Sequence, residues 1–255
     1  MDIKNLNSFI NNFLNGFLKF FNPRQLVGGL EISGSDLKFI LIKDNNLIST
    51  SLKLPAGIIE EGKIKDKAAF KNILNKLRSQ IGINVSSREK IYVIVSIPDT
   101  DIYIQTFNLP ILSPEGVEEA ARLNLQMISP IDFSSVYADW QEIGEIDIDG
   151  GQLEILGVFA PRQFIDELNE CLKESKFAAT AIEFLSLSIN RLASGLSYLS
   201  DFFLLLNLNS DGLSFGLIKK NDLYFNHFVP WPKTEDRQIS FESVKEIIIQ
   251  ETKKV

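Results

Sequence analysis

Residues 27–42 read VGGLEISGSDLKFILI, and this stretch decides the fold of the chain. Two short apolar runs flank the turn Ser33-Gly34-Ser35, so the pattern predicts a β-hairpin with strands at 29–32 and 37–42. Backbone N–H groups in such a turn can hold a phosphate, and Lys38 lies close by in the sequence. The same residues also suit a plain hairpin turn with a solvated lysine, so both interpretations stay open at this point.

The pattern after this hairpin continues with more strands and one helix. Apolar runs rich in β-branched residues predict an antiparallel strand at 47–54 and a buried strand at 90–97. Between them, Asp66 is placed to cap a helix over 67–81, whose apolar side chains recur at helical spacing. Three antiparallel strands, a helix and a buried strand make up the first half of an α/β domain.

A different unit interrupts this pattern over residues 101–176. It reads as a strand, a helix that begins at Pro114 with Ser113 as its N-cap, a hairpin and a second helix. The order β-α-β-β-α suits a small α+β module inserted into the first domain. A strand at 179–184 then returns to the parent sheet, and a helix over 185–196 follows it.

The last part of the chain repeats the opening motif, with three apolar runs separated by turns. We expect strands at 202–208, 213–219 and 223–229, with a helix over 241–254 after them. An internal duplication follows from this repeat. A complete second domain needs further strands and helices, so we expect the chain to be truncated at its C-terminus.

Composition excludes several classes of function. The chain has 255 residues, a net charge of −7 and a pI near 4.9, which disfavours the basic face that nucleic-acid binding requires. One cysteine, Cys171, and one histidine, His227, cannot form an internal disulfide or the usual zinc ligand set. We expect His227 to be a strand residue without a catalytic role. The acidic run at 145–150 imitates a calcium loop but has Leu156 at the twelfth position, so it reads as a charged hairpin tip.

The N-terminal segment, residues 1–25, carries apolar side chains at helical spacing. These are Leu6, Phe9, Ile10, Phe13, Leu14, Phe17, Leu18 and Phe21. Polar interruptions exclude a membrane-spanning helix, and a secretory cleavage site is lacking. The stripe either packs on the protein body or a partner chain, or lies in a membrane interface. Its polar face is rich in Asn rather than Lys and Arg, which favours packing.

Several segments, taken in order, resemble the PilM family of actin-like proteins. They are GLEISGSDLK (29–38), LPAGII (54–59) with GKIKD (62–66), VSIPD (95–99) with FNLP (107–110), and SPID (129–132) with YADW (137–140). The resemblance implies an α/β, actin-like (ribonuclease H-like) fold with an inserted α+β subdomain of the SHS2 type, which the family shares with FtsA. The domains would then be 1–25 (amphipathic helix), 26–100 with 177–200 (first actin-like domain), 101–176 (inserted subdomain) and 201–255 (first part of a second actin-like domain).

The resemblance also implies a function and a location. Proteins of this family are scaffolds of the type IV pilus inner-membrane assembly complex. They grip the short cytoplasmic N-terminal peptide of a PilN-like membrane partner between the first domain and the inserted subdomain. We therefore expect a cytoplasmic protein at the inner face of the cytoplasmic membrane. Two alternatives stay open: a nucleotide-switched actin-like ATPase, and a component of a secretion system similar to GspL.

A nucleotide site is the remaining implication of the resemblance. The residues that would cradle ATP with Mg²⁺ are Glu31, Ser33, Gly34, Ser35, Lys38, Asn207 and Ser214. Several depart from the family pattern: Glu31 replaces Asp, Ser33 replaces Gly, and Asn207 replaces the second Asp. Hydrated Mg²⁺ tolerates such shifts poorly, and by the resemblance we expect the adenosine-binding part of the family to fall beyond Val255. The altered loops thus argue against a working ATP site, and we expect neither catalytic residues nor a resident metal.

Overall fold

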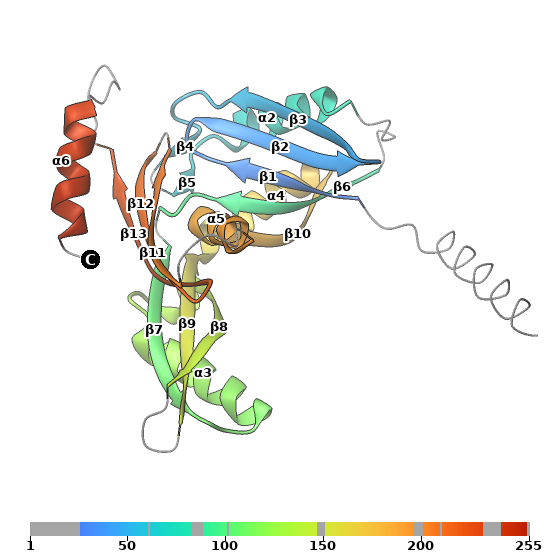
Figure 1. Cartoon of the computed structure of the whole chain (residues 1–255). Coiled ribbons are helices and arrows are strands. Elements are labelled where there is room, and N and C mark those ends of the chain that lie inside the picture. Colours follow the sequence, from blue (N-terminus) through green and yellow to red (C-terminus); the bar gives the residue numbers. More distant parts are fainter. Residues whose placement is uncertain are drawn as a thin grey trace, which may run out of the picture.

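The computed structural model describes residues 26–60, 62–82, 89–100, 102–146, 151–195, 201–209, 211–231 and 241–253. It contains three β-sheets of three or more strands, each in a separate part of the molecule (Figure 1). The predicted N-terminal amphipathic helix (1–25) and part of the acidic hairpin tip (147–150) lie outside the described residues.

The first sheet is built around the hairpin that the sequence predicts. Its strand order is β10-β6-β1-β2-β3, with β1 antiparallel to β2 and parallel to β6. The bounds are β1 (Val27–Ile32), β2 (Asp36–Lys43), β3 (Asn46–Lys53), β6 (Ile91–Ile97) and β10 (Phe177–Phe184). The short strands β4 (Ile59–Glu60) and β5 (Lys63–Ile64) form a ribbon of their own between β3 and the first described helix.

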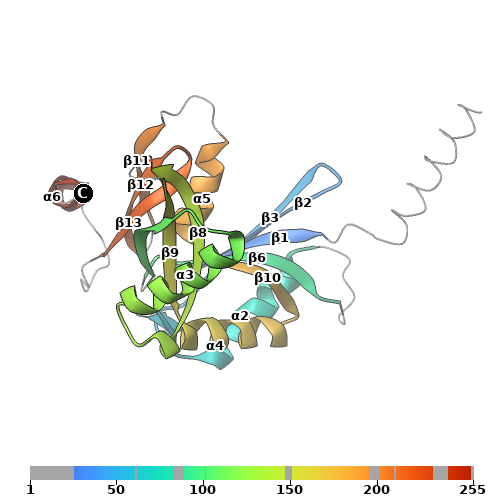
Figure 2. The same cartoon turned by 90° about the horizontal axis from the view of Figure 1, so that it is seen from below.

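Helices α2 (Lys67–Gln80) and α4 (Arg162–Glu174) cover one face of this sheet and pack against each other (Figure 2). The predicted cap of α2 is confirmed, because the Asp66 carboxylate accepts a 2.9 Å hydrogen bond from the amide of Ala69. The main core lies between these helices and the sheet. Its fully buried side chains include Leu30, Phe39, Phe70, Leu74, Leu77, Leu168, Leu172 and Phe177.

The position of α4 differs from the prediction, which grouped this helix with the inserted unit. Its apolar side chains, from Phe164 to Leu172, belong to the same core as Phe70 on α2 and Phe177 on β10. The apolar stripe of α4 fixes which of its faces is buried, but it does not say which sheet covers that face. The inserted part is therefore β-α-β-β, and α4 covers the sheet of the first domain.

The opposite face of the first sheet has a polar and an apolar half. Strand register places Lys38, Glu31, Ser96 and Glu183 in one row across β2, β1, β6 and β10. Helix α5 (Leu185–Ser194) lies against this row, and its Ser188 hydroxyl is 2.8 Å from a carboxylate oxygen of Glu183. The apolar half holds the exposed side chains of Ile40, Ile42, Leu47 and Ile94. The polar half is the one that leads to the β1–β2 turn.

The inserted unit forms a second sheet, of order β7-β9-β8, with β7 at its edge. Its elements are β7 (Tyr103–Pro110), α3 (Pro114–Ile128), the 3-10 turn η1 (Phe133–Ser135), β8 (Val136–Ile146) and β9 (Gln152–Pro161). The Ser113 hydroxyl caps α3 through the amide of Gly116, as predicted. Helix α3 packs on this sheet through small cores of its own around Ala121 and Leu125.

The third sheet repeats the opening hairpin and third strand, as the sequence predicts. Its strands are β11 (Phe202–Leu208), β12 (Gly212–Lys219) and β13 (Asp222–Pro230), with β13 at an edge, and helix α6 (Phe241–Thr252) follows. Ile218 and Leu223 extend into the main core. On the other side, Glu154 of β9 accepts hydrogen bonds from Tyr224 (2.6 Å) and Lys219 (3.1 Å), which ties the third sheet to the inserted unit. Among the described residues, no helix has the length and apolarity to cross a membrane.

Candidate functional site

The structure brings the two hairpin tips of the predicted phosphate loops together. The amide of Gly34, in the β1–β2 turn, donates to both carboxylate oxygens of Asp211, at 3.1 and 2.9 Å. Asp211 lies in the β11–β12 turn, 177 residues further along the chain. A Cβ at position 34 would lie 2.6 Å from an Asp211 oxygen, so this approach requires glycine. The geometry places a carboxylate where the β1–β2 turn could hold a phosphate.

The other amides of the β1–β2 turn are also engaged within the protein. The amide of Ser33 donates to the carbonyl of Asp36 at 2.9 Å. The Ser33 hydroxyl in turn accepts from the amides of Ser35 (3.3 Å) and Asp36 (2.9 Å). Ser33, which replaces the family's glycine, thus supplies a side chain that takes up two amides of its own turn. All four amides from Ser33 to Asp36 have internal acceptors.

The β11–β12 turn is held in a similar way. The Asn209 side-chain oxygen accepts from the amides of Asp211 (2.8 Å) and Gly212 (3.0 Å). Trp231 secures the turn from the end of β13, because its indole N–H donates to the Asn209 carbonyl and its amide donates to the Asp211 carbonyl. Asn209 and Trp231 therefore fix the backbone that presents Asp211 to Gly34.

Lys38 and Glu31, both predicted ligands, form an ion pair across β1 and β2. The Lys38 ammonium lies 2.7 Å from a Glu31 oxygen, and the Lys38 side chain is 54% exposed. Beside them, Asp36 is bonded to Lys53 and to the Ser35 hydroxyl. Partial burial raises the pKa of Asp36, but these two partners outweigh it and leave the pKa lowered. The charges around the β1–β2 turn are therefore largely balanced within the protein.

Asp99 is a buried acceptor whose position no local sequence pattern indicates. It follows β6 in the VSIPD segment and is 1% exposed. It accepts hydrogen bonds from the amide (3.0 Å) and hydroxyl (2.6 Å) of Ser186, at the start of α5, and from the Ser214 hydroxyl of β12. A carboxylate at a helix N-terminus also satisfies amides that lack partners within the helix. Asp99 thus joins the first domain, α5 and the third sheet.

The last two predicted ligands, Ser214 and Asn207, are surrounded by other groups of the protein. Ser214 is buried and donates to Asp99, so its hydroxyl does not face an open nucleotide cleft. Asn207 lies opposite Ser214 in the β11–β12 register. Its side-chain nitrogen is buried and has no hydrogen-bond partner in the structure. The arrangement brings the seven predicted residues to one region of the fold, but it leaves no ready phosphate cradle there.

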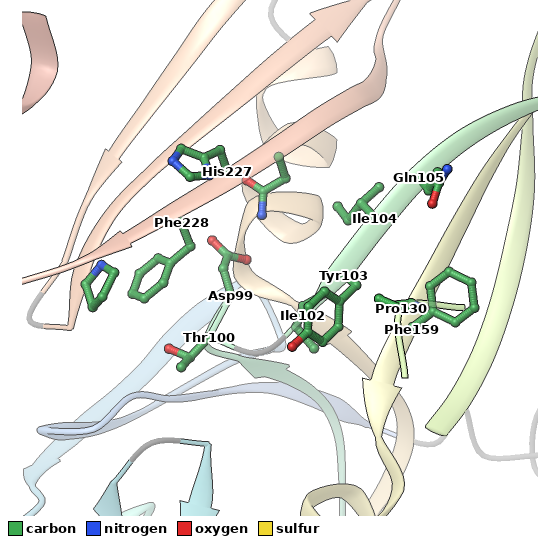
Figure 3. A pocket seen from close by; sticks show the side chains of 12 residues that line it. Asp99, Thr100, Ile102, Tyr103, Ile104, Gln105, Pro130, Phe159, His227 and Phe228 are labelled. Atoms are coloured by element: carbon green, nitrogen blue, oxygen red, sulfur yellow. The ribbon is translucent and has the colours of Figure 1, made fainter. Parts of the chain in front are cut away.

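A cavity of about 430 Å³ opens beside this region, between the inserted unit and the third sheet. Figure 3 shows Tyr103, Ile104 and Gln105 along β7 on one side and Phe228 of β13 on the other, with Asp99 between them. Both strands are edge strands of their sheets. The volume lies within the usual range of ligand pockets.

The wall formed by β13 includes two polar side chains. Asn226 lines the cavity, and its side-chain oxygen is buried without a hydrogen-bond partner in the structure. His227, expected to be a strand residue without a catalytic role, also lines the cavity and lies 3.1 Å from a Glu251 oxygen of α6. Sequence alone did not indicate this wall, because the cavity forms only where two edge strands from distant segments approach each other. No cluster of potential metal ligands occurs among the residues that the structure describes.

No family model matches the chain, and no curated protein does. Solved structures do match. A chain of the PilM–PilN type IV pilus biogenesis complex superposes with a TM-score of 0.70 and 19% identity, covering 88% of this chain. The protein has a PilM-like fold. It spans 65% of the length of that matched chain. The predicted actin-like α/β architecture with an inserted α+β unit is thus confirmed at the level of the fold.

Two further solved structures superpose on this chain less closely. The cytoplasmic domain of EpsL, an inner-membrane component of the type II secretion system of Vibrio cholerae, superposes with a TM-score of 0.51 and 10% identity. That match covers 80% of this chain and 71% of the EpsL chain. A protein with an actin-like ATPase fold and unknown function from Bacteroides thetaiotaomicron gives a TM-score of 0.48 at 14% identity, covering 91% of this chain and 79% of that one.

Proposed function

We propose that this protein is a scaffold that binds an extended peptide, the N-terminal cytoplasmic segment of a PilN-like membrane protein. The observation that carries the proposal is the cavity between β7 and β13. It adjoins Asp99 and Thr100, which follow the last residues of β6, so the first domain and the inserted unit both contribute to it. The resemblance to PilM implies a peptide groove between the first domain and the inserted unit. The cavity touches that junction through Asp99 and Thr100, and its opposite wall comes from the third sheet.

The walls of the cavity suit an extended chain. Edge strands carry backbone N–H and C=O groups without a neighbouring strand, and a peptide added along such an edge forms main-chain hydrogen bonds. Alternate side chains of such a peptide would find apolar contacts with Ile102, Tyr103 and Phe228. The buried oxygen of Asn226 supplies an acceptor for one N–H group of the ligand. A short peptide with alternating apolar residues meets all three requirements.

The similarity to solved structures supports the choice of partner. One match is a chain of a PilM–PilN complex, and another is a cytoplasmic domain of an inner-membrane secretion component. On this basis the proposed location is the inner face of the cytoplasmic membrane, and the proposed assembly is a type IV pilus complex. A secretion system of the EpsL kind is the alternative setting, and the higher TM-score of the PilM chain favours the pilus.

The geometry of the β1–β2 turn favours the role of a nucleotide-switched ATPase less than it favours the role of a peptide-binding scaffold. A phosphate needs free backbone amides, whereas all four amides from Ser33 to Asp36 have internal acceptors. The Lys38 ammonium is paired with Glu31. Peptide binding at the cavity requires none of these groups, so the two functions can be tested separately.

The test is a fluorescence-anisotropy titration with a labelled synthetic peptide that copies the N-terminal cytoplasmic residues of a PilN-like protein. Gln105→Trp would fill the cavity from an exposed position on β7 and should weaken binding by at least about tenfold, which is about 1.4 kcal/mol. Gln152→Trp, at the far end of the same sheet, is the matched control and should bind as the wild type does. Equal binding by both variants would contradict this location, and absence of binding to the unmodified protein would contradict the function.

A further inference from the structure

We propose that the β1–β2 turn is an oxyanion-binding site that this chain fills with its own Asp211 carboxylate. The Gly34 amide donates to both oxygens of that carboxylate, at 3.1 and 2.9 Å. Backbone amides of a glycine-containing turn bind phosphate oxygens through the same geometry, since a carboxylate and a phosphate both present oxygen acceptors with negative charge. Asp211 is thus an internal substitute for a phosphate group.

The protein holds this internal ligand in a fixed position. The Asp211 amide donates to Asn209, and the Asp211 carbonyl accepts from Trp231, so the backbone is anchored on both sides of the carboxylate. The β1–β2 turn is fixed as well, by the Ser33 hydroxyl. Two groups held rigidly in bonding geometry lose little entropy when they meet, which favours the internal contact over a free anion in solution.

The contact has a consequence for external ligands. An anion that approaches the Gly34 amide must displace a carboxylate of the same sign of charge, and the two cannot share one N–H group. Inorganic phosphate and the terminal phosphate of a nucleotide have the chemistry to take this place. We therefore expect that neither of them reaches the Gly34 amide while Asp211 is present, and that removal of Asp211 frees this amide for an external anion.

The test follows the Gly34 amide resonance of the ¹⁵N-labelled full chain by nuclear magnetic resonance. Sodium phosphate and Mg-ATP are added separately at constant ionic strength. In Asp211→Ala the Gly34 resonance should shift with added phosphate, with an apparent affinity at least about tenfold higher than in the wild type. Asp211→Asn keeps a neutral acceptor of the same shape, so its apparent affinity for phosphate should lie between those of the wild type and Asp211→Ala. This variant replaces Asp211→Ala in the experiment if the alanine variant does not fold.

Control variants and opposing outcomes make the test decisive. Asp201→Ala removes one negative charge from the other end of the same hairpin and should behave as the wild type. A response to Mg-ATP at concentrations where phosphate alone gives none would assign the opened site to a nucleotide, and equal responses would assign it to free phosphate.

A wild-type Gly34 resonance that shifts as strongly as that of Asp211→Ala would overturn the proposal. So would a folded Asp211→Ala protein, with its other resonances unchanged, that responds to neither anion. Peptide binding at the cavity does not enter this experiment, so the proposed function stands or falls independently.

Discussion

At the scale of single residues, buried polar groups join the three sheets. Asp99 accepts three hydrogen bonds, from the amide and hydroxyl of Ser186 and from the Ser214 hydroxyl, at a position that is 1% exposed. A buried carboxylate loses its hydration, and these donors replace the lost water. Because the donors come from α5 and β12, Asp99 positions both elements relative to the end of β6.

Replacing Asp99 with alanine should lower the free energy of unfolding by about 3 kcal/mol, since the variant leaves buried donors without an acceptor. Urea denaturation followed by circular dichroism measures this loss. Asp66→Ala is a useful comparison, because it removes an exposed helix cap and should cost only about 1 kcal/mol. Equal losses in the two variants would mean that Asp99 has no special role in joining the sheets.

Cys171 gives a second prediction at this scale. The thiol lies in the main core at 1% exposure, and burial raises its pKa above the usual value. Thiol reagents attack the thiolate, so Ellman's reagent should label the native protein far more slowly than the urea-unfolded chain. Ser51→Cys, at an exposed position on β3, provides an accessible thiol for comparison in the same protein. Native labelling of Cys171 at the rate of that engineered thiol would contradict the packing of α4 on the first sheet.

At the scale of elements, the contact between β9 and the third sheet depends on charge. Burial raises the pKa of Glu154, but hydrogen bonds from Tyr224 and Lys219 outweigh it, and the pKa is lowered. A carboxylate whose pKa falls on folding stabilises the protein above its unfolded pKa of about 4.3. That contribution is lost as the pH falls through the lower, folded value. Conversely, the hydrogen bond to Glu154 raises the pKa of Tyr224. The protonated phenol therefore stabilises the folded protein below the unfolded pKa of about 10, and this stabilisation is lost as the pH rises through the higher, folded value.

Glu154→Gln should therefore reduce the stability at pH 7 by about 2 kcal/mol and flatten its pH dependence between about pH 3 and pH 5. Thermal melts over this pH range measure both effects. Glu142→Gln, at an exposed position on the neighbouring strand β8, removes the same charge and should leave the pH profile as it is. A wild-type protein whose stability does not fall between pH 5 and pH 3 would exclude this role of Glu154.

The elements themselves were largely predictable, and their assignment to sheets was less so. Capping residues and turns located α2 and α3 because these signals act within a few residues of the chain. The grouping of α4 failed because its apolar stripe fits either neighbouring sheet. The Gly34–Asp211 contact joins turns 177 residues apart, and no local pattern in the sequence encodes such a pair. The cavity wall from β13 was missed for the same reason.

At the scale of the whole molecule, contacts between parts should make unfolding cooperative. Polar contacts of Asp99, Glu154 and Asp211 each cross from one sheet to another. The two tryptophans report on different parts, Trp140 on the inserted sheet and Trp231 at the end of β13. Urea titrations of Trp231→Phe and Trp140→Phe, each followed by the remaining tryptophan, should give midpoints that coincide with those from circular dichroism of the same variant. Two separate transitions would show that the sheets are independent units.

The parallel pair of β6 and β10 also affects how the protein forms during synthesis. Strand β6 ends at Ile97, and its partner β10 begins at Phe177, after the whole inserted unit and α4. A ribosome that adds about 5–20 residues per second needs roughly 4–16 s to make these 80 or so residues. Strand β6 is an inner strand of the finished sheet, but throughout that interval it is an edge strand, and such an edge is a template for pairing with other chains. The order of the elements thus gives a chaperone an exposed strand to protect during this interval of synthesis.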